Sequence, residues 1–247
     1  YEISVRDWSS DVCSSDHNVP FDLVAAVLGV YAVIAYVVLR DRPDRQIAPG
    51  TVLRRLSSTL REPVTLQMSA LYAMAFGGFV AFSVYLPTYL VTTFHLDRGD
   101  AALRAAGFVV LAVVMRPVGG WLSDRFNPVT VLVTTYFAVT ALAVLAAFKP
   151  ALMPLGTAAF LGMAAALGTA TGAVFALLAQ LVAPAQVGSV TGVVGAAGGL
   201  GGLFPPLVMG AVYGATGSYL VGFRLLATTA AAAGSVQIGR ASCRERV

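Results

Sequence analysis

Arg116 is a charge inside an apolar stretch, and its chemistry points to an anion. Between Ala101 and Leu122 the only charged residues are Arg104, near the start, and Arg116, past the middle. A guanidinium keeps its proton in proteins, so placing it in hydrocarbon is costly unless a counter-charge offsets it. Its planar fork can donate two parallel hydrogen bonds to a planar anion. Snorkelling of the side chain to a polar interface is the alternative interpretation.

A glycine-rich face follows further along the chain, within Val187–Gly210. Five glycines recur at intervals of four, three, four and three residues, which places them on one helix face: Gly188, Gly192, Gly195, Gly199 and Gly202. Gly198 and Gly201 widen that face. Each glycine costs about 1 kcal/mol of helix stability relative to alanine, so close packing or close approach of a ligand must offset the cost. The spacing alone favours a packing seam between helices over a ligand path.

The stretch "GGWLSDR", Gly119–Arg125, ends the same apolar run that begins at residue 101. Gly119 and Gly120 allow a neighbouring helix to approach closely. Asp124 can pair with a basic side chain or with a helix N-terminus, where the dipole favours an anion. Together with Arg125, these residues are candidates for a gating motif. An ordinary charged turn at a helix end is the alternative.

The elements that must position these residues are long apolar helices. The chain is 57% hydrophobic and 11% charged, and apolar runs of about 18 or more residues are typical of membrane-spanning helices. A large soluble helical bundle would need charged faces at helical spacing, and these runs have none. We therefore predict an all-α, multi-pass protein of the cell inner (plasma) membrane that contacts the lipid bilayer through seven spans: 20–39, 64–92, 101–122, 128–148, 151–182, 187–213 and 217–236.

The long polar stretch Arg40–Glu62 sets the orientation of these spans. It carries six arginines against three acidic residues, and the positive-inside rule makes it cytoplasmic. Alternation then places residues 94–100 outside and residues 123–128 inside. This layout matches the middle and second half of a twelve-helix protein built from two six-helix halves. It consists of one span within residues 17–39, a cytoplasmic loop at 40–62 and six closely connected spans within 63–237.

Both ends of the chain differ from the rest in composition and origin. The stretches Asp7–Asp16, "DWSSDVCSSD", and 238–247, "IGRASCRERV", are compatible with translated sequencing adapters. We therefore expect residues 1–16 and 238–247 to be non-native tails, and we exclude them from the predicted fold. Both cysteines, Cys13 and Cys243, lie in these tails, so cysteine usage says nothing about the redox compartment.

Residues on three predicted spans fall at similar depths in the membrane. Counting inward from the cytoplasmic end of its span, at about 1.5 Å per residue, places Arg116 near 12 Å. Four other residues lie at roughly 13 and 20 Å, namely Tyr72 and Phe76, four residues apart on one face, and Gly195 and Gly199. Because the hydrocarbon core is about 30 Å thick, all five approach its middle, where proteins built from two such halves bind substrate.

Four segments, in the same order, resemble segments of one known family. They are similar to the nitrate/nitrite porter family of the major facilitator superfamily: "LYAMAFGGFVAFSVYLPTYL" at 71–90, "MRPVGGWLSDRFN" at 115–127, "GAVFALLAQLVAPAQVGSVTG" at 172–192 and "TGVVGAAGGLGGLFPP" at 191–206. The resemblance covers nearly all of residues 17–237. Thr171 departs from the family pattern, in which we expect asparagine before Gly172.

The resemblance implies a membrane transporter that moves nitrate or nitrite by alternating access in nitrate assimilation. It implies that Arg116 is one half of an arginine clamp for the anion, and that the other arginine belongs to an N-terminal half absent from this fragment. It also implies that aromatic side chains and glycine-rich helices help to form the substrate site. The substrate-binding residues it implies are Arg116, Tyr72, Phe76, Gly195, Gly198 and Gly199. The gating motif that it implies consists of Gly119, Gly120, Asp124 and Arg125.

Other functions stay open on the residues alone. A different small anion or a drug is an alternative substrate, and a non-transporting membrane scaffold is an alternative of another class. No Asp or Glu lies deep in the six spans of 63–237, so these spans offer no carboxylate for a proton relay. The sequence shows no catalytic constellation, metal-ligand cluster or phosphate loop, so we predict neither an enzyme nor a cofactor. Its basic residues form no basic face, which argues against nucleic acid as a partner.

Overall fold

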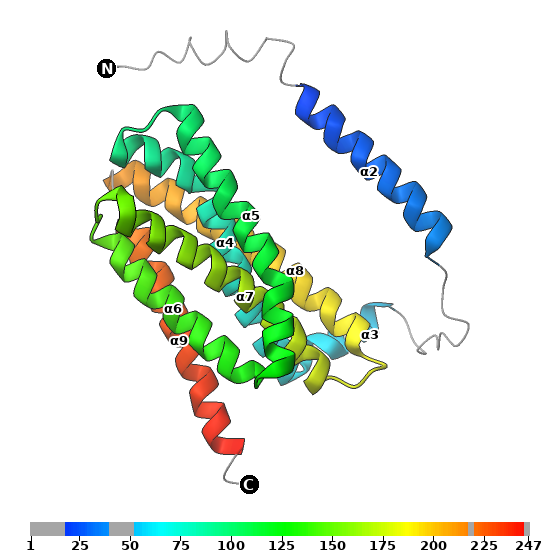
Figure 1. Cartoon of the computed structure of the whole chain (residues 1–247). Helices are drawn as coiled ribbons and strands as arrows, with labels where there is room; N and C mark the ends of the chain where they lie inside the picture. The colour runs from blue at the N-terminus through cyan, green and yellow to red at the C-terminus, as the bar shows by residue number, and fades with distance from the viewer. Residues whose placement is uncertain (1–17, 40–51, 217–219, 245–247) are drawn as a thin grey trace. The chain divides into compact units, whose positions relative to one another are not determined.

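The computed structural model describes residues 18–39, 52–216 and 220–244, and every regular element in these ranges is a helix (Figure 1). The chain divides into two units, residues 1–49 and 50–247. The first unit holds α2 (Asn18–Val38), a helix of 21 residues whose apolar side chains are exposed. A helix that is apolar on all sides is typical of a membrane span.

The second unit is a bundle of long helices joined by short connections (Figure 1). Its elements in chain order are α3 (Val52–Arg61), α4 (Pro63–Phe94), α5 (Arg98–Arg125), α6 (Pro128–Ala147), the π-helical turn η3 (Leu152–Gly156), α7 (Thr157–Leu181), α8 (Val187–Thr216) and α9 (Leu220–Arg244). The predicted all-α membrane fold is confirmed. Most helix ends lie within about three residues of the predicted ones, although α9 continues past residue 236.

Six of the predicted spans are confirmed as helices long and apolar enough to cross a membrane, within the ranges that the structure describes: α2, α4, α5, α6, η3 with α7, and α8. The seventh predicted span corresponds to α9, which does not reach that standard over its described residues. Arg224, Gln237 and two threonines stand among its alanines and leucines, which lowers its mean hydropathy. The helix itself packs along α6.

Three predicted regions extend beyond the described residues. Residues 1–16, predicted as a non-native tail, lie outside them altogether. In the other predicted tail, 238–247, the backbone is helical as far as Arg244, and its non-native origin stays a prediction. The central loop at 40–62 contains a helix that the sequence did not predict, α3, while residues 40–51 lie outside the described ranges.

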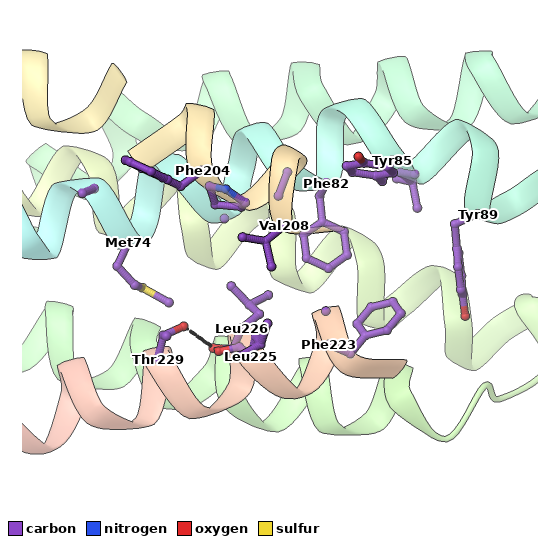
Figure 2. A pocket seen from close by; sticks show the side chains of 16 residues that line it. Met74, Phe82, Tyr85, Tyr89, Phe204, Val208, Phe223, Leu225, Leu226 and Thr229 are labelled. Atoms are coloured by element: carbon purple, nitrogen blue, oxygen red, sulfur yellow. Dashed lines mark hydrogen bonds between the residues drawn. The ribbon is translucent and has the colours of Figure 1, made fainter. Parts of the chain in front are cut away.

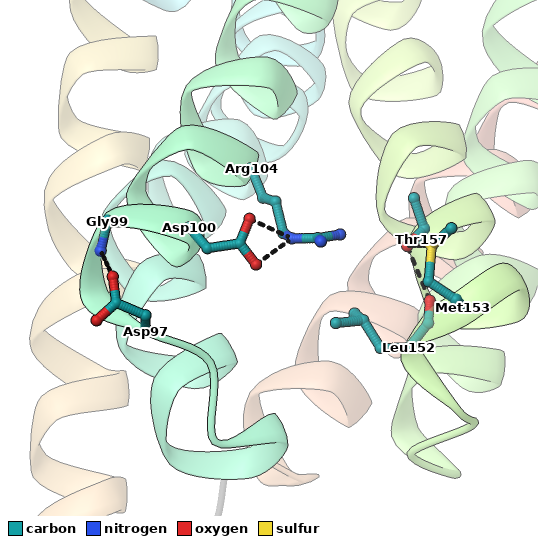
Figure 3. Close-up of polar contacts among 7 residues, drawn as sticks. All are labelled: Asp97, Gly99, Asp100, Arg104, Leu152, Met153 and Thr157. Carbon is teal, nitrogen blue, oxygen red and sulfur yellow. Dashed lines mark hydrogen bonds and ion pairs between the residues drawn. The ribbon is translucent and has the colours of Figure 1, made fainter.

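Capping residues fix where the helices that carry the candidate site begin. The Asp97 side chain accepts a hydrogen bond from the Gly99 backbone N–H, at 2.8 Å, and thereby caps α5 (Figure 3). Asn127 caps α6 in the same way by accepting from Val129, at 2.9 Å. α4 starts with Pro63 in its first turn, where the missing N–H costs no helical hydrogen bond. The connections before α4, α5 and α6 are therefore short and well defined.

Close helix pairs make up the bundle: α4 packs with α8, α5 with α7, and α6 with both α9 and α7. Two buried clusters form its core, one around Phe108 and Leu167 and the other around Met68 and Tyr136. Tyr136 is fully buried and donates its hydroxyl to the Leu71 carbonyl at 2.8 Å. This bond satisfies a polar group in an apolar core and ties α6 to α4.

Candidate functional site

Arg116 lies within α5, nine residues before the end of the helix at Arg125, which is about 14 Å along the axis. Its guanidinium carbon lies 5.4 Å from the centre of the Phe76 ring and 5.0 Å from the centre of the Phe79 ring, both on α4. These distances are typical of cation–π contacts, which gain strength where water is excluded. The charged end of Arg116 is therefore directed at an aromatic face of α4.

The aromatic face of α4 continues from this contact to a third helix. Tyr72 stacks on Phe76 with ring centres 5.5 Å apart, and it meets Phe175 of α7 edge to face at 4.8 Å. Phe76 and Phe79 lie 6.0 Å apart. Such offset and edge-to-face arrangements stabilise each other beyond their buried area. The predicted residues Tyr72, Phe76 and Arg116 thus lie in one cluster formed by α4, α5 and α7.

Two members of this cluster, Phe79 and Phe175, are absent from the sequence-based prediction. Phe79 follows Phe76 by three residues, so the helical spacing could have found it. Phe175 comes from a different helix, and no local signal connects it with Tyr72.

The charge of Arg116 has no counter-charge among the residues that the structure describes. Its Nε atom is buried, without a hydrogen-bond partner in that part of the chain. The Arg116 side chain as a whole is half-buried, and a cation partly withdrawn from water without a counter-charge is costly; the two aromatic rings compensate part of that cost. The arrangement is suited to receive an anion.

Glycines bring α5 and α7 into backbone contact around Arg116. A Cβ atom on Gly172 of α7 would overlap the Arg116 backbone carbonyl, and one on Gly168 would overlap the Ala112 carbonyl. From the other side, a Cβ on Gly119 of α5 would overlap the Thr169 carbonyl. Only glycine permits so close an approach. This seam holds the backbone of Arg116 against α7.

The seven glycines of the predicted glycine-rich face of α8 divide into two groups. Gly198, Gly201 and Gly202 face α4, and a Cβ on Gly198 would overlap the Tyr72 ring. The second group is exposed, with no atom within 4 Å of the Cβ position: Gly188, Gly192, Gly195 and Gly199. The structure thus brings Gly198 to the aromatic cluster. It leaves the other two predicted glycines, Gly195 and Gly199, on an open face of this unit.

The predicted gating residues lie at the end of α5. Gly119 is buried in the seam with α7, and Gly120 is half-buried, with open space where its Cβ would lie. Asp124 and Arg125 are exposed, and no ion pair joins either of them to another described residue. Their role as a gate stays a prediction.

Two other polar side chains of α5 and α7 have partners on their own helices. Arg104 donates from Nε to both oxygens of Asp100, one turn earlier, at 3.0 and 3.1 Å (Figure 3). The Thr171 hydroxyl, at the position that departs from the family pattern, donates to the Gly168 carbonyl at 2.6 Å. No group of histidine, cysteine or acidic residues that could hold a metal occurs among the described residues.

A family model described as the Major Facilitator Superfamily matches residues 17–206. The chain belongs to this superfamily. Superfamily members are built from two six-helix halves, each containing two three-helix repeats of inverted topology. The helix pairs agree with such an arrangement, since α4 packs with α8 as α7 packs with α5.

Several curated relatives are named for nitrate or nitrite. The "Probable nitrate/nitrite transporter NarK2" of Mycobacterium tuberculosis is 51% identical over 209 residues, which are 84% of this chain and 53% of that protein. The "Nitrite extrusion protein" of Bacillus subtilis is 36% identical over 206 residues, 83% of this chain and 51% of that protein. The resemblance to nitrate/nitrite transporters is confirmed. The chain spans about half the length of the curated relatives it matches.

Among solved structures, the superfamily transporter FucP in its outward conformation has a TM-score of 0.70 and 21% identity to this chain. The match covers 90% of this chain and 54% of FucP. At this identity the likeness concerns the fold alone. It agrees with the predicted all-α, multi-pass fold.

Proposed function

We propose that this chain is the central and C-terminal part of a nitrate/nitrite transporter that works by alternating access. In this proposal, Arg116 supplies one half of an arginine clamp around the anion, and Tyr72, Phe76 and Gly198 shape the site. The relatives named for nitrate and nitrite support the substrate class.

The observation that carries the proposal is the unpaired guanidinium of Arg116. It lies mid-way along a membrane-spanning helix over two aromatic rings, with no acidic partner among the described residues. A charge near the bilayer centre costs about 3 kcal/mol even on lenient scales. A bound anion offsets that charge, and the planar fork of arginine matches a planar oxyanion through two parallel hydrogen bonds.

The surroundings of Arg116 explain how the site would attract an anion and how anion binding would favour closure. Aromatic walls exclude water, which strengthens the attraction between guanidinium and anion. The glycine seam with α7 fixes the backbone of Arg116, so its side chain reaches the site from a rigid support. With a second arginine opposite, two cations repel each other until an anion lies between them. Anion binding would then favour closure of the two halves.

The second half of the site would come from an N-terminal half of the same protein. The chain spans about half the length of its curated relatives. The open glycines of α8, which carry no side chain to hinder approach, offer a surface for that half. In this proposal Gly195 and Gly199 face the path of the anion between the halves.

The test is anion flux by the full-length protein that contains this chain, reconstituted in vesicles. We expect uptake of nitrate or nitrite, and we expect Arg116→Ala to abolish it. Arg116→Lys should reduce flux strongly, because an ammonium cannot donate two parallel bonds from a planar fork. The matched control is Arg104→Ala on the same helix, whose side chain is exposed and paired with Asp100; its flux should match wild type.

The same measurements address the alternatives. A wild-type protein that carries another small anion or a drug, but neither nitrate nor nitrite, contradicts the proposed substrate. A scaffold without transport predicts that Arg116→Lys changes neither flux nor the affinity for any ligand. Either result removes nitrate/nitrite transport as the function.

A further inference from the structure

A cavity separate from the arginine site lies between α4, α8 and α9. Its volume is about 330 Å³, and Figure 2 shows side chains from the three helices pointing into it. Phe82 and Tyr85 of α4, Phe204 and Val208 of α8, and Phe223 and Leu226 of α9 contribute to its walls. We propose that this slot binds one acyl chain of a membrane phospholipid.

The chemistry of the lining excludes an ion or a polar metabolite. None of the lining residues is charged. The Tyr85 hydroxyl donates to the Pro206 carbonyl at 2.6 Å, and the Thr229 hydroxyl donates to the Leu225 carbonyl of its own helix at 2.7 Å (Figure 2). These two hydroxyl groups are therefore engaged within the protein. The third hydroxyl group of the lining belongs to Tyr89, where the lining along α4 ends. An apolar occupant loses nothing in such a slot, whereas a polar one would leave its hydrogen bonds unmade.

The shape of the slot fits a chain better than a compact molecule. Along α4 the lining runs from Ala73 to Tyr89, which is about 24 Å at the rise of an α-helix. The hydrocarbon core of a bilayer is about 30 Å thick. The walls from α8 and α9 are shorter, at residues 204–208 and 222–229, so the slot is elongated along α4 and matches the direction of an extended acyl chain.

The slot arises from an asymmetry between the two repeats of the bundle. In inverted repeats, the pairing of α6 with α7 corresponds to the pairing of α9 with α4. The backbone of α6 runs close to that of α7, but the backbones of α9 and α4 approach each other at few positions, and aromatic side chains such as Phe82 and Phe223 meet between them. The interface between α6 and α7 is therefore closed, whereas the corresponding interface between α9 and α4 leaves a gap. The slot occupies this gap.

The mouth of the slot faces away from the open glycine face of α8. Phe204 and Val208 line the slot and are exposed, at 61% and 43%. Phe204 follows Gly195 by nine residues, and Val208 follows Gly199 by the same number. Nine residues make about two and a half helical turns, so each pair points to opposite sides. If the other half of the protein covers the glycine face, as the proposed function has it, the slot opens to lipid.

The test uses the full-length protein in vesicles of a phospholipid with a photoactivatable group in its acyl chain, followed by mass-spectrometric mapping of the adducts. We expect adducts on Phe204, Val208 and Leu225 to exceed those on Val144 several-fold. Val144 is as exposed as Leu225 (both 45%) but lies on α6, outside the slot. Equal labelling of the two regions, or labelling of Val144 alone, overturns the proposal.

A matched pair of variants then separates filling of the slot from a change of surface. Val208→Trp places a large ring in the slot and should reduce adducts on Phe223 and Leu225 about fivefold. Val144→Trp makes the same change on α6 and should leave them unchanged. Ala81→Leu fills the slot from α4 and provides the same test if Val208→Trp does not fold. Undiminished labelling in a folded slot-filling variant contradicts the proposal. Because no anion enters this experiment, its outcome is independent of nitrate or nitrite flux.

Discussion

Glycines occur in pairs four residues apart on both α7 and α8, but the surroundings of the two pairs differ. On α7, Gly168 and Gly172 lie against carbonyl groups of α5, and a Cβ on either would overlap them. On α8, Gly195 and Gly199 have no atom within 4 Å of the Cβ position. Spacing alone cannot distinguish these two situations, because it reports a face of a helix and not what the face meets.

The difference separates two reasons for having glycine in a helix. On α7 close packing offsets the loss of about 1 kcal/mol per residue, and that packing holds Arg116 in place. On the open face of α8 no packing within the described unit offsets it. The cost there must be offset by something outside this unit, which in the proposed function is the other half of the transporter and the anion between the halves.

The largest effect should come from Gly172→Ala in the closed seam. The added methyl meets the backbone carbonyl of Arg116, and a backbone group cannot yield unless α5 and α7 separate. Overpacking of this kind costs about 1–3 kcal/mol. We expect a clear fall in the apparent melting temperature, measured by scanning fluorimetry in detergent, and a loss of anion flux.

The control for that change is Gly107→Ala on α5, where the Cβ would meet open space. Its melting temperature should equal that of wild type or exceed it, since alanine favours the helix. A Gly172→Ala protein as stable as the Gly107→Ala protein would contradict the description of the seam.

Gly198→Ala should have a smaller effect, because it meets a side chain and not a backbone. The methyl would overlap the Tyr72 ring, which can rotate away from Phe76 and Phe175. We expect a loss of stability of about 1 kcal/mol and a KM for nitrate or nitrite raised several-fold. Gly214→Ala, in open space near the other end of α8, serves as control. An unchanged KM in Gly198→Ala would remove Tyr72 from the site.

Phe79→Leu tests whether the aromatic surroundings of Arg116 matter to the anion. Leucine keeps much of the apolar bulk but removes the ring that lies 5.0 Å from the guanidinium. Cation–π contacts contribute about 0.5–2 kcal/mol, so we expect KM to rise about twofold to thirtyfold without a large change in stability. Phe148→Leu, at an exposed residue just after α6, should change neither quantity.

The sequence predicts those parts of the fold and site that follow from spacing along one helix. Apolar runs identify the spans, and the pair Tyr72 and Phe76 shows as one helix face. The neighbourhood of Phe175 could not be predicted, because it depends on how α7 meets α4. The division of the α8 glycines is likewise set by the position of α4. The slot depends on how few positions bring the backbones of α9 and α4 together. These are relations between helices, which no single segment encodes.

The smallest effect on stability, and the sharpest test of the comparison, belongs to Gly199→Ala. Because no described atom lies within 4 Å of the new methyl, stability of the helix should be unchanged or rise by up to about 1 kcal/mol. If the open face meets the other half during alternating access, the same methyl should slow flux in the full-length protein. Gly107→Ala again provides the control, since it should raise stability and leave flux intact. Full flux in Gly199→Ala, with Gly172→Ala inactive, would show that transport requires the closed seam between α5 and α7. It would contradict a role for the open glycine face of α8 in the path of the anion.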